Sequence, residues 1–235
     1  MKTICFKRIV FCHTLTFIKT WTPSQTNRLT LTLTLRQIEL SRYASTTWNI
    51  KTGRVMQIEV RIASQADLSE LCVNHMVKLV NSVYLSAEEG LWVPVADGFP
   101  GRTSVTEIKS MWASERLALA WLGTQIIGCV HVDLIDADRA EFGMLVTAPE
   151  YRGQGLGLHL IKFAEDWARR HGCKTMQLEL LTPRDWVHPV KETLHNWYGR
   201  LGYKPVRAIA PKEAFPHLVM SLSTPCKFTI YEKSI

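Results

Sequence analysis

Residues 140–172, AEFGMLVTAPEYRGQGLGLHLIKFAEDWARRHG, contain a strand, a glycine-rich turn and a helix in immediate succession. The apolar run over 140–147 is of strand type, and residues 158–171 have helical periodicity. The turn between them ends on three alternating glycines, Gly153, Gly155 and Gly157. Such a turn leaves several backbone N–H groups without partners at the positive end of a helix. The stretch therefore predicts an anion-binding turn, with a purely structural strand-to-helix turn as the alternative.

The glycine spacing differs from that of two common phosphate sites. No Gly-Lys-Ser/Thr follows the turn, so it is not a P-loop. The third residue after Gly155 is Leu158, so the GxGxxG pattern of dinucleotide-binding folds is absent as well. A dinucleotide site is therefore disfavoured.

Length and composition predict one soluble domain. The chain has 235 residues with 46% apolar side chains, which is typical of a globular protein. No apolar run approaches the roughly 18 residues that a membrane span needs. The net charge of +7 is concentrated in residues 1–55, where nine Lys and Arg face one acid. The other 180 residues hold 19 basic and 20 acidic side chains. We therefore expect neither a nucleic-acid nor a membrane partner.

Residues 1–55 are rich in Ser, Thr and Arg, and they do not resemble part of a fold. Three interpretations remain open: a mitochondrial presequence, a secretory signal, or a non-native extension ahead of a true start at Met56. The secretory signal fits least well, because no small-residue cleavage site follows the apolar run at 9–18. A cytoplasmic location is expected, or a mitochondrial one if the segment is a presequence.

Cysteine and histidine spacing gives no metal signature. The cysteines form no CxxC pair and lie at Cys5, Cys12, Cys72, Cys129, Cys173 and Cys226. We expect buried free thiols in a reducing compartment. The eight histidines form no HExxH pattern and no cluster with cysteine, so no metal site is predicted.

The predicted elements follow the order β-α-α-β-β-β-α-β-α-β-β. They are a strand at 57–63, a helix opened by Ser64, a short helix opened by Ser104, strands at 116–122, 126–134 and 140–147, a helix at 158–171, a strand at 174–181, a helix at 190–201, and strands at 203–207 and 218–222. Both helix openings have capping-box spacing, Ser64 with Asp67 and Ser104 with Glu107. Consecutive strands in the middle indicate a mixed, partly antiparallel sheet.

The segment Arg152-Gly-Gln-Gly155-Leu-Gly157, preceded by LVTAPEY, closely resembles the acyl-CoA-binding motif R/Q-x-x-G-x-G/A of the GNAT superfamily of N-acetyltransferases. The resemblance covers about residues 57–224, and the family has the element order given above. It implies an α/β (α+β) three-layer fold with a mixed, largely antiparallel sheet of six to seven strands flanked by helices. The domain is expected at 56–224, with a C-terminal tail at 225–235.

The resemblance implies acetyl-CoA as co-substrate. Its expected contacts are Met144, Leu145, Val146, Arg152, Gly153, Gln154, Gly155, Leu156 and Gly157. In the family, the turn holds the pyrophosphate and the preceding strand pairs with the pantetheine arm. A bulge splays that strand and leaves a peptide N–H free to polarise the thioester carbonyl. Such a donor lowers a reaction barrier by about 3 kcal/mol.

A second match is Asn196-Trp-Tyr198-Gly-Arg-Leu-Gly202-Tyr203, which is similar to the family's xxFYeklGF. In the family this tyrosine commonly protonates the departing thiolate, so Tyr198 is the expected general acid. A phenol with a pKa near ~10 carries its proton at neutral pH, as an acid must. The alternative is a tyrosine that only packs its ring on the core.

A base is also expected, because an alkylammonium cannot attack a thioester until it loses a proton. Glu141 and Glu179 are carboxylates in otherwise apolar strands, and a charged residue there needs a reason. Glu179 matches a glutamate that some family members use, directly or through water. The alternative is that strand alternation turns either carboxylate to solvent.

The sequence departs from the family pattern near the acid. Lys191 stands where members often carry an asparagine, and segment 182–190 is longer than the minimal pattern. His188 and His195 are expected to have surface or packing roles. The acceptor is expected to enter between segment 85–103, the strand end near Val146 and segment 182–190. Three aromatic side chains either line this entrance or belong to the core: Trp92, Phe99 and Trp186.

Together these features predict transfer of acetyl from acetyl-CoA to a primary amine, on a small molecule or on a peptide or protein. No Cys or Ser is placed as a covalent nucleophile, so direct attack in a ternary complex is preferred. The alternatives are a non-catalytic acyl-CoA-binding regulatory module and a different nucleotide-binding α/β protein.

Overall fold

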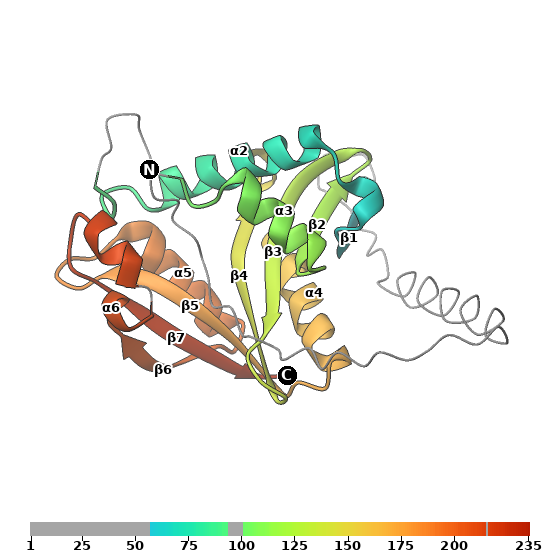
Figure 1. Cartoon of the computed structure of the whole chain (residues 1–235). Coiled ribbons are helices and arrows are strands. Elements are labelled where there is room, and N and C mark those ends of the chain that lie inside the picture. Colours follow the sequence, from blue (N-terminus) through green and yellow to red (C-terminus); the bar gives the residue numbers. More distant parts are fainter. Residues whose placement is uncertain (1–56, 94–100, 215) are drawn as a thin grey trace, which may run out of the picture.

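The computed structural model describes residues 57–93, 101–214 and 216–235. They form one seven-stranded sheet in the order β1-β2-β3-β4-β5-β7-β6 (Figure 1). The strands are β1 Ile58–Ile62, β2 Leu117–Leu122, β3 Gln125–Leu134, β4 Arg139–Thr147, β5 Thr175–Pro183, β6 Lys204–Ile209 and β7 Cys226–Ser234. All pairs are antiparallel except β4 with β5. The predicted mixed, largely antiparallel sheet is confirmed.

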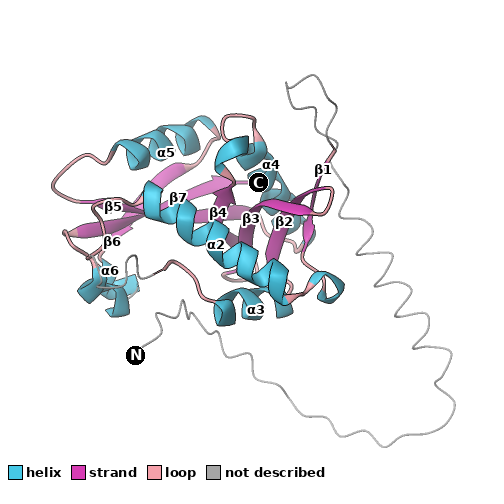
Figure 2. Ribbon diagram, turned by 90° about the horizontal axis from the view of Figure 1, so that it is seen from above, coloured by secondary structure: helices cyan, strands magenta, loops and turns pink. Residues whose placement is uncertain are grey.

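Helices cover both faces of the sheet. The α-helices are α2 Glu70–Ala87, α3 Val105–Ala113, α4 Leu156–Arg170, α5 Pro189–Arg200 and α6 Pro211–Ala214, and the 3-10 helices are η1 Gln65–Asp67, η2 Pro149–Tyr151 and η3 Pro216–Ser221. Helices α2, α3 and α6 lie on one side of the sheet and α4 and α5 on the other (Figure 2). A hydrophobic core lies on each face of the sheet, and alternating side chains of one strand contribute to both. Cys129 packs toward α2 and α3, whereas Val130 packs toward α4.

The first helix starts later than predicted. The Ser64–Asp67 capping box forms, but it encloses η1. At Leu68 the backbone is extended, and α2 begins at Glu70 with the Ser69 hydroxyl accepting from the Cys72 N–H. The Ser104–Glu107 box caps α3 as predicted.

The end of the chain corrects two predictions. Residues 218–222 were expected to be a strand, but η3 spans Pro216–Ser221. Residues 225–235, expected to be a tail, instead contain β7, which lies between β5 and β6. Buried Cys226, Phe228 and Ile230 alternate with outward-facing residues, so the strand contributes to the core.

Some predictions concern residues outside the described ranges, namely those on residues 1–55 and on Phe99. Within the described ranges, no helix combines the length and apolarity needed to cross a bilayer. In the same ranges no three His, Cys, Asp or Glu side chains cluster as metal ligands. The described cysteines, Cys72, Cys129, Cys173 and Cys226, are free thiols, as predicted.

Candidate active site

Strands β4 and β5 pair at one end and then separate. Their parallel register runs from Arg139 opposite Thr175 to Glu141 opposite Gln177 and goes no further. Figure 1 shows the two strands diverging from the end near the C-terminus. We call the region between them beyond Glu141 and Gln177 the β4–β5 fork. One backbone edge of β4 faces this fork without β5 as a partner, so it can pair with an extended ligand.

A bulge in β4 lies on the fork. Gly143 pairs with His131 and Val146 pairs with Cys129, so two β4 residues oppose one residue of β3. Met144 has a φ of 46°, a strained value for a residue with a side chain. The Cys129 thiol donates to the Met144 carbonyl over 3.5 Å. The predicted bulge is therefore present, and it turns backbone away from the β3 ladder.

The glycine turn leads from this strand to an open helix end. Gly155 is the N-cap of α4, with a φ of 86° that favours glycine, and no side chain caps the helix. The first helical bond runs from the His159 N–H to the Gly155 carbonyl. The N–H groups of the three residues in between have no acceptor within the helix. The first turn also carries no carboxylate, so the helix end suits an anion.

The third glycine has a different role from the one predicted. Gly157 lies inside α4, which starts two residues earlier than expected. A Cβ on Gly157 would stand 3.2 Å from Cη2 of Trp197 on α5. Glycine therefore allows α5, the helix that carries Tyr198, to pack closely on the start of α4.

The other predicted turn residues offer backbone and surface groups. The Leu156 side chain is buried in the core, so only its backbone is available to a ligand. Arg152 is exposed beside the turn. The Gln154 amide donates to the Glu150 carbonyl over 2.8 Å, and its buried Oε1 has no protein partner. Because that oxygen is buried, the turn offers a ligand its backbone N–H groups and the exposed Arg152 side chain, and both suit a phosphate.

Tyr198 is buried where α5 meets β4. Its ring lies 6.2 Å from that of Phe142, two residues before the bulge, and 6.2 Å from that of Tyr231. Burial raises the pKa of Tyr198 above its ordinary value, and the nearby Tyr84 and Tyr231 hydroxyls add to this. Tyr198 therefore holds its proton at neutral pH, as a general acid must.

Tyr84 approaches the same place from the other face of the sheet. It lies on α2, and it influences the pKa of Tyr198, which lies on α5. Burial raises the pKa of Tyr84 to about 12, although the Arg102 guanidinium opposes this. Tyr84 is not among the site residues that the sequence predicts. Its proximity to Tyr198 is a tertiary feature that no local pattern shows.

A buried cluster of four side chains, which we call the Glu88 cluster, joins α2 to α5. It consists of Glu88, Trp92, Arg102 and Lys191. Glu88 accepts from Lys191 Nζ at 2.7 Å and from Trp92 Nε1 at 2.8 Å, and Arg102 Nε lies 3.6 Å away. Burial alone would raise the pKa of Glu88, but Arg102 and Lys191 hold it below the ordinary value. Lys191 thus fills the position where the family often has asparagine, as half of a buried ion pair.

Glu141 and Glu179 are half-buried on the face that α2 and α3 cover. Glu141 follows Ala140 and Glu179 follows Leu178, and both of these apolar residues pack toward α4. Strand alternation therefore turns the two carboxylates to the opposite face. Both engage in further interactions. Glu141 is the last paired residue of β4 before the fork, and Glu179 lies on β5 two residues beyond the last paired residue, Gln177.

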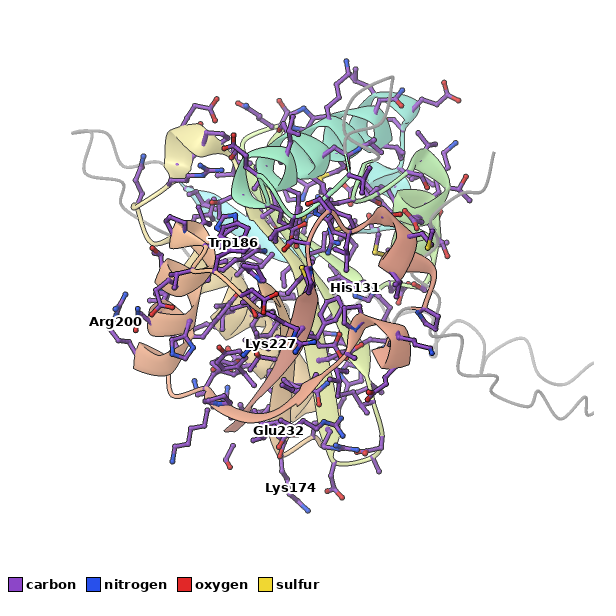
Figure 3. The ribbon with its side chains drawn as sticks, turned by 90° about the vertical axis from the view of Figure 1, so that its left-hand side faces the viewer. His131, Lys174, Trp186, Arg200, Lys227 and Glu232 are labelled. Atoms are coloured by element: carbon purple, nitrogen blue, oxygen red, sulfur yellow. The ribbon has the colours of Figure 1, made fainter. Side chains whose placement is uncertain are left out.

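The remaining predicted residues have packing or surface roles. His188 is buried as the N-cap of α5, and its ring stacks on Trp186 with centroids 5.3 Å apart. His195 is exposed and bonds to the Tyr231 hydroxyl at 2.6 Å. Trp92 is buried in the Glu88 cluster, whereas Trp186 is 41% exposed (Figure 3).

The fork, its bulge and the uncapped helix coincide with a family match. The model of the acetyltransferase (GNAT) family matches residues 88–203. The chain carries a GNAT acetyltransferase domain. The predictions of the GNAT fold and of an acetyltransferase that uses acetyl-CoA are confirmed at the level of the family. Comparison with curated protein sequences gives no match.

Solved structures share the fold at low sequence identity. An acetyltransferase from Streptococcus agalactiae is 17% identical with a TM-score of 0.52, covering 76% of this GNAT chain and 98% of its own. An aminoglycoside 6'-N-acetyltransferase complexed with coenzyme A is 14% identical with a TM-score of 0.55, covering 74% and 96%. Naa50 of Arabidopsis thaliana, in complex with the bisubstrate analogue CoA-Ac-MVNAL, is 16% identical with a TM-score of 0.50, covering 76% and 99%. At these identities the likeness is one of fold.

Proposed function

We propose that this GNAT protein transfers acetyl from acetyl-CoA to a primary amine by direct attack in a ternary complex. The observation that carries the proposal is the continuous path from the β4 bulge, along the fork, to the uncapped start of α4. An extended pantetheine arm would pair with the backbone of Met144–Val146, and the pyrophosphate would lie on the turn at Arg152–Gly157. The amide groups of the pantetheine arm suit the free backbone edge of a strand, and the negative charge of the pyrophosphate suits the N–H groups at a helix start.

Three kinds of group would act on the reactants: the carboxylates of Glu141 and Glu179, a backbone N–H at the bulge, and the phenol of Tyr198. The amine loses its proton on the face of the sheet that holds Glu141 and Glu179. Its nitrogen lone pair then attacks the thioester carbon. A backbone N–H at the bulge stabilises the negative oxygen that develops. The C–S bond breaks, and Tyr198 donates its proton to the departing thiolate. The acylated nitrogen then loses its second proton to solvent, and the Tyr198 phenolate takes a proton from solvent, which gives the amide and restores the phenol. Tyr198 suits this step because it is buried beside the bulge and remains protonated.

Direct attack is favoured over an acetyl-cysteine intermediate. Cys129 is the thiol at the bulge, and burial raises its pKa to about 12. A thiol in that state is not a nucleophile at neutral pH. Its hydrogen bond to the Met144 carbonyl instead helps to hold the backbone of the bulge.

The acceptor class stays open between small amines and the amines of peptides or proteins. The aminoglycoside enzyme and the peptide-analogue complex among the structural neighbours illustrate both kinds on one fold. A non-catalytic acyl-CoA-binding module is the second candidate, because the same fork and turn would serve binding without turnover.

The Tyr198→Phe variant separates the two candidates. Thiol release from acetyl-CoA is followed with a panel of amines, and coenzyme A affinity is measured by calorimetry on the same full-length samples. The enzyme assignment predicts that wild type releases thiol only with an amine present. The variant should lose turnover by about 100-fold or more while retaining coenzyme A affinity. Unchanged turnover in the variant would remove Tyr198 as the acid, and no turnover in wild type would favour the binding module.

A further inference from the structure

One polar side chain on β3, the strand that borders β4 on the side away from the fork, has no part in the reaction so far. His131 lies on β3, opposite Gly143 of β4, the residue directly before Met144 of the bulge. Cys129, two residues earlier on β3, packs toward α2 and α3, whereas Val130 and Val132 pack toward α4. Alternation therefore places His131 on the same face as Glu141 and Glu179. Figure 3 shows it toward the middle of the molecule, while Lys174 and Arg200 extend outward.

Gly143 keeps the space between these side chains open. A Cβ built on Gly143 meets no atom within 4 Å. Cross-strand neighbours have Cβ positions about 5 Å apart, so the His131 imidazole stands beside this open space. Glu141 lies two residues away on the same strand, and Glu179 lies on β5, two residues beyond the last paired position, Gln177. Three groups that can bind or accept a proton thus lie on one face of three neighbouring strands, close in register to the bulge.

The surroundings of His131 keep its ring neutral. Burial lowers the pKa of His131, Arg116 acts in the same direction, and Asp133 opposes them. Arg116 precedes β2 and pairs with Asp133 of β3 at 3.7 Å. Strand alternation also places Glu141, Glu179, Arg139 and Glu232 on this face, and the last two lie 3.9 Å apart. A neutral imidazole can accept a proton, whereas a carboxylate beside an ammonium stabilises the protonated amine.

We propose that His131 takes the proton that the acceptor ammonium loses, while Glu141 and Glu179 bind that ammonium. This inference rests on the proposed acetyl transfer. It assigns binding of the acceptor ammonium and removal of its proton to different side chains. The ammonium N–H bond breaks and its proton moves to the imidazole, directly or through one water. The nitrogen lone pair then forms the C–N bond, and the thiolate leaves with the Tyr198 proton. The acylated nitrogen releases its second proton to solvent, and the Tyr198 phenolate regains a proton from solvent. The imidazolium returns its proton to solvent beside Asp133, whose side chain is 42% exposed.

The pH dependence of three full-length variants tests the division of roles. These are His131→Gln, Glu179→Gln and the control His171→Gln, which changes an exposed histidine beyond the far end of α4. The rate is measured against pH at saturating acetyl-CoA, with the best amine of the panel. In wild type, kcat/KM should fall with a slope of one below a pKa under the ordinary histidine value of about 6.5.

The His131→Gln variant should lose kcat by about 100-fold with little change in the amine KM, and its acidic limb should disappear. The Glu179→Gln variant should raise the amine KM and keep the limb, and His171→Gln should match wild type. An acidic limb that persists in His131→Gln, or that vanishes in Glu179→Gln, overturns the assignment.

An NMR titration of the imidazoles in wild type gives a second test that needs no variant to fold. A His131 pKa at or above 6.5 would also overturn the assignment. Absence of acetyl transfer in wild type would remove the proposed function and this inference together. Transfer with an unaltered limb in His131→Gln would remove this inference alone.

Discussion

The buried ion pair between Glu88 and Lys191 should respond asymmetrically to removal of either partner. The two side chains are 2% and 5% exposed, and the ammonium lies 2.7 Å from Glu88 Oε1. In Glu88→Leu the buried Lys191 ammonium loses this carboxylate, and such a loss costs about 3–5 kcal/mol. In Lys191→Met the Glu88 carboxylate keeps Trp92 and Arg102 as partners. The cost should then be nearer ~2 kcal/mol, the value of one charged hydrogen bond.

Thermal unfolding of full-length protein measures the difference. For a domain of this size, 1 kcal/mol corresponds to roughly 2–4 °C. We expect Glu88→Leu to lower Tm by about 10 °C and Lys191→Met by about 5 °C. The double variant should cost less than the sum, because it leaves neither charge of the pair alone. The control is Lys174→Met, which breaks an exposed pair with Asp138 at 3.0 Å and should cost less than about 1 kcal/mol (Figure 3).

The pH dependence of this pair has a defined sign. The folded-state pKa of Glu88 is lowered, so its contribution is complete above the ordinary carboxyl value of 4.5 and is lost as pH falls through the folded value. The gap between wild type and Glu88→Leu should therefore shrink in acid. If Lys191→Met costs as much as Glu88→Leu, or if the double variant costs the full sum, the assignment of Glu88 as the shared anion is wrong.

Three further predictions follow from single contacts. Gly128→Ala would place a Cβ 2.7 Å from the Val146 carbonyl, so calorimetry should show weaker coenzyme A binding, whereas Gly143→Ala, which meets nothing within 4 Å, should bind normally. Because the pKa of Cys129 is about 12, a thiol-alkylating reagent at pH 7 should leave turnover intact after modifying the half-buried Cys72, and inactivation that Cys129→Ala prevents would contradict this. Deleting residues 225–235 should abolish cooperative unfolding, because β7 pairs with both β5 and β6, and a stable truncated protein would show that the segment is dispensable.

The order of elements is predictable because each local pattern agrees with its neighbours. Alternating strands, two capping boxes and helical periodicity predict the succession from β1 to β6. The last strand is not predicted: it is expected at 218–222, whereas β7 spans Cys226–Ser234, where Cys226, Phe228 and Ile230 alternate with residues of the other face. Strand order depends on which edges pair, and no local pattern encodes that.

The glycine turn and Tyr198 can be located from sequence because their signals are contiguous. The bulge at Met144 requires a register shift between two strands, so its position becomes certain only in the fold. Glu88 and Lys191 are 103 positions apart, and neither has a local feature that marks it as buried. His131 becomes a candidate only when its cross-strand partner, Gly143, is known, because that glycine leaves open space beside the imidazole. Sequence therefore finds the co-substrate motif, whereas the groups that surround the amine emerge from pairing and packing.

Calorimetric titration of the full-length chain with coenzyme A shows whether the fork and the glycine turn bind the co-substrate. We predict saturable binding of one coenzyme A per chain, no binding of NAD, and loss of affinity when Gly155→Val forces a branched side chain into the φ of 86° at the start of α4. Binding of NAD without coenzyme A, or undiminished coenzyme A affinity in folded Gly155→Val, would contradict the account.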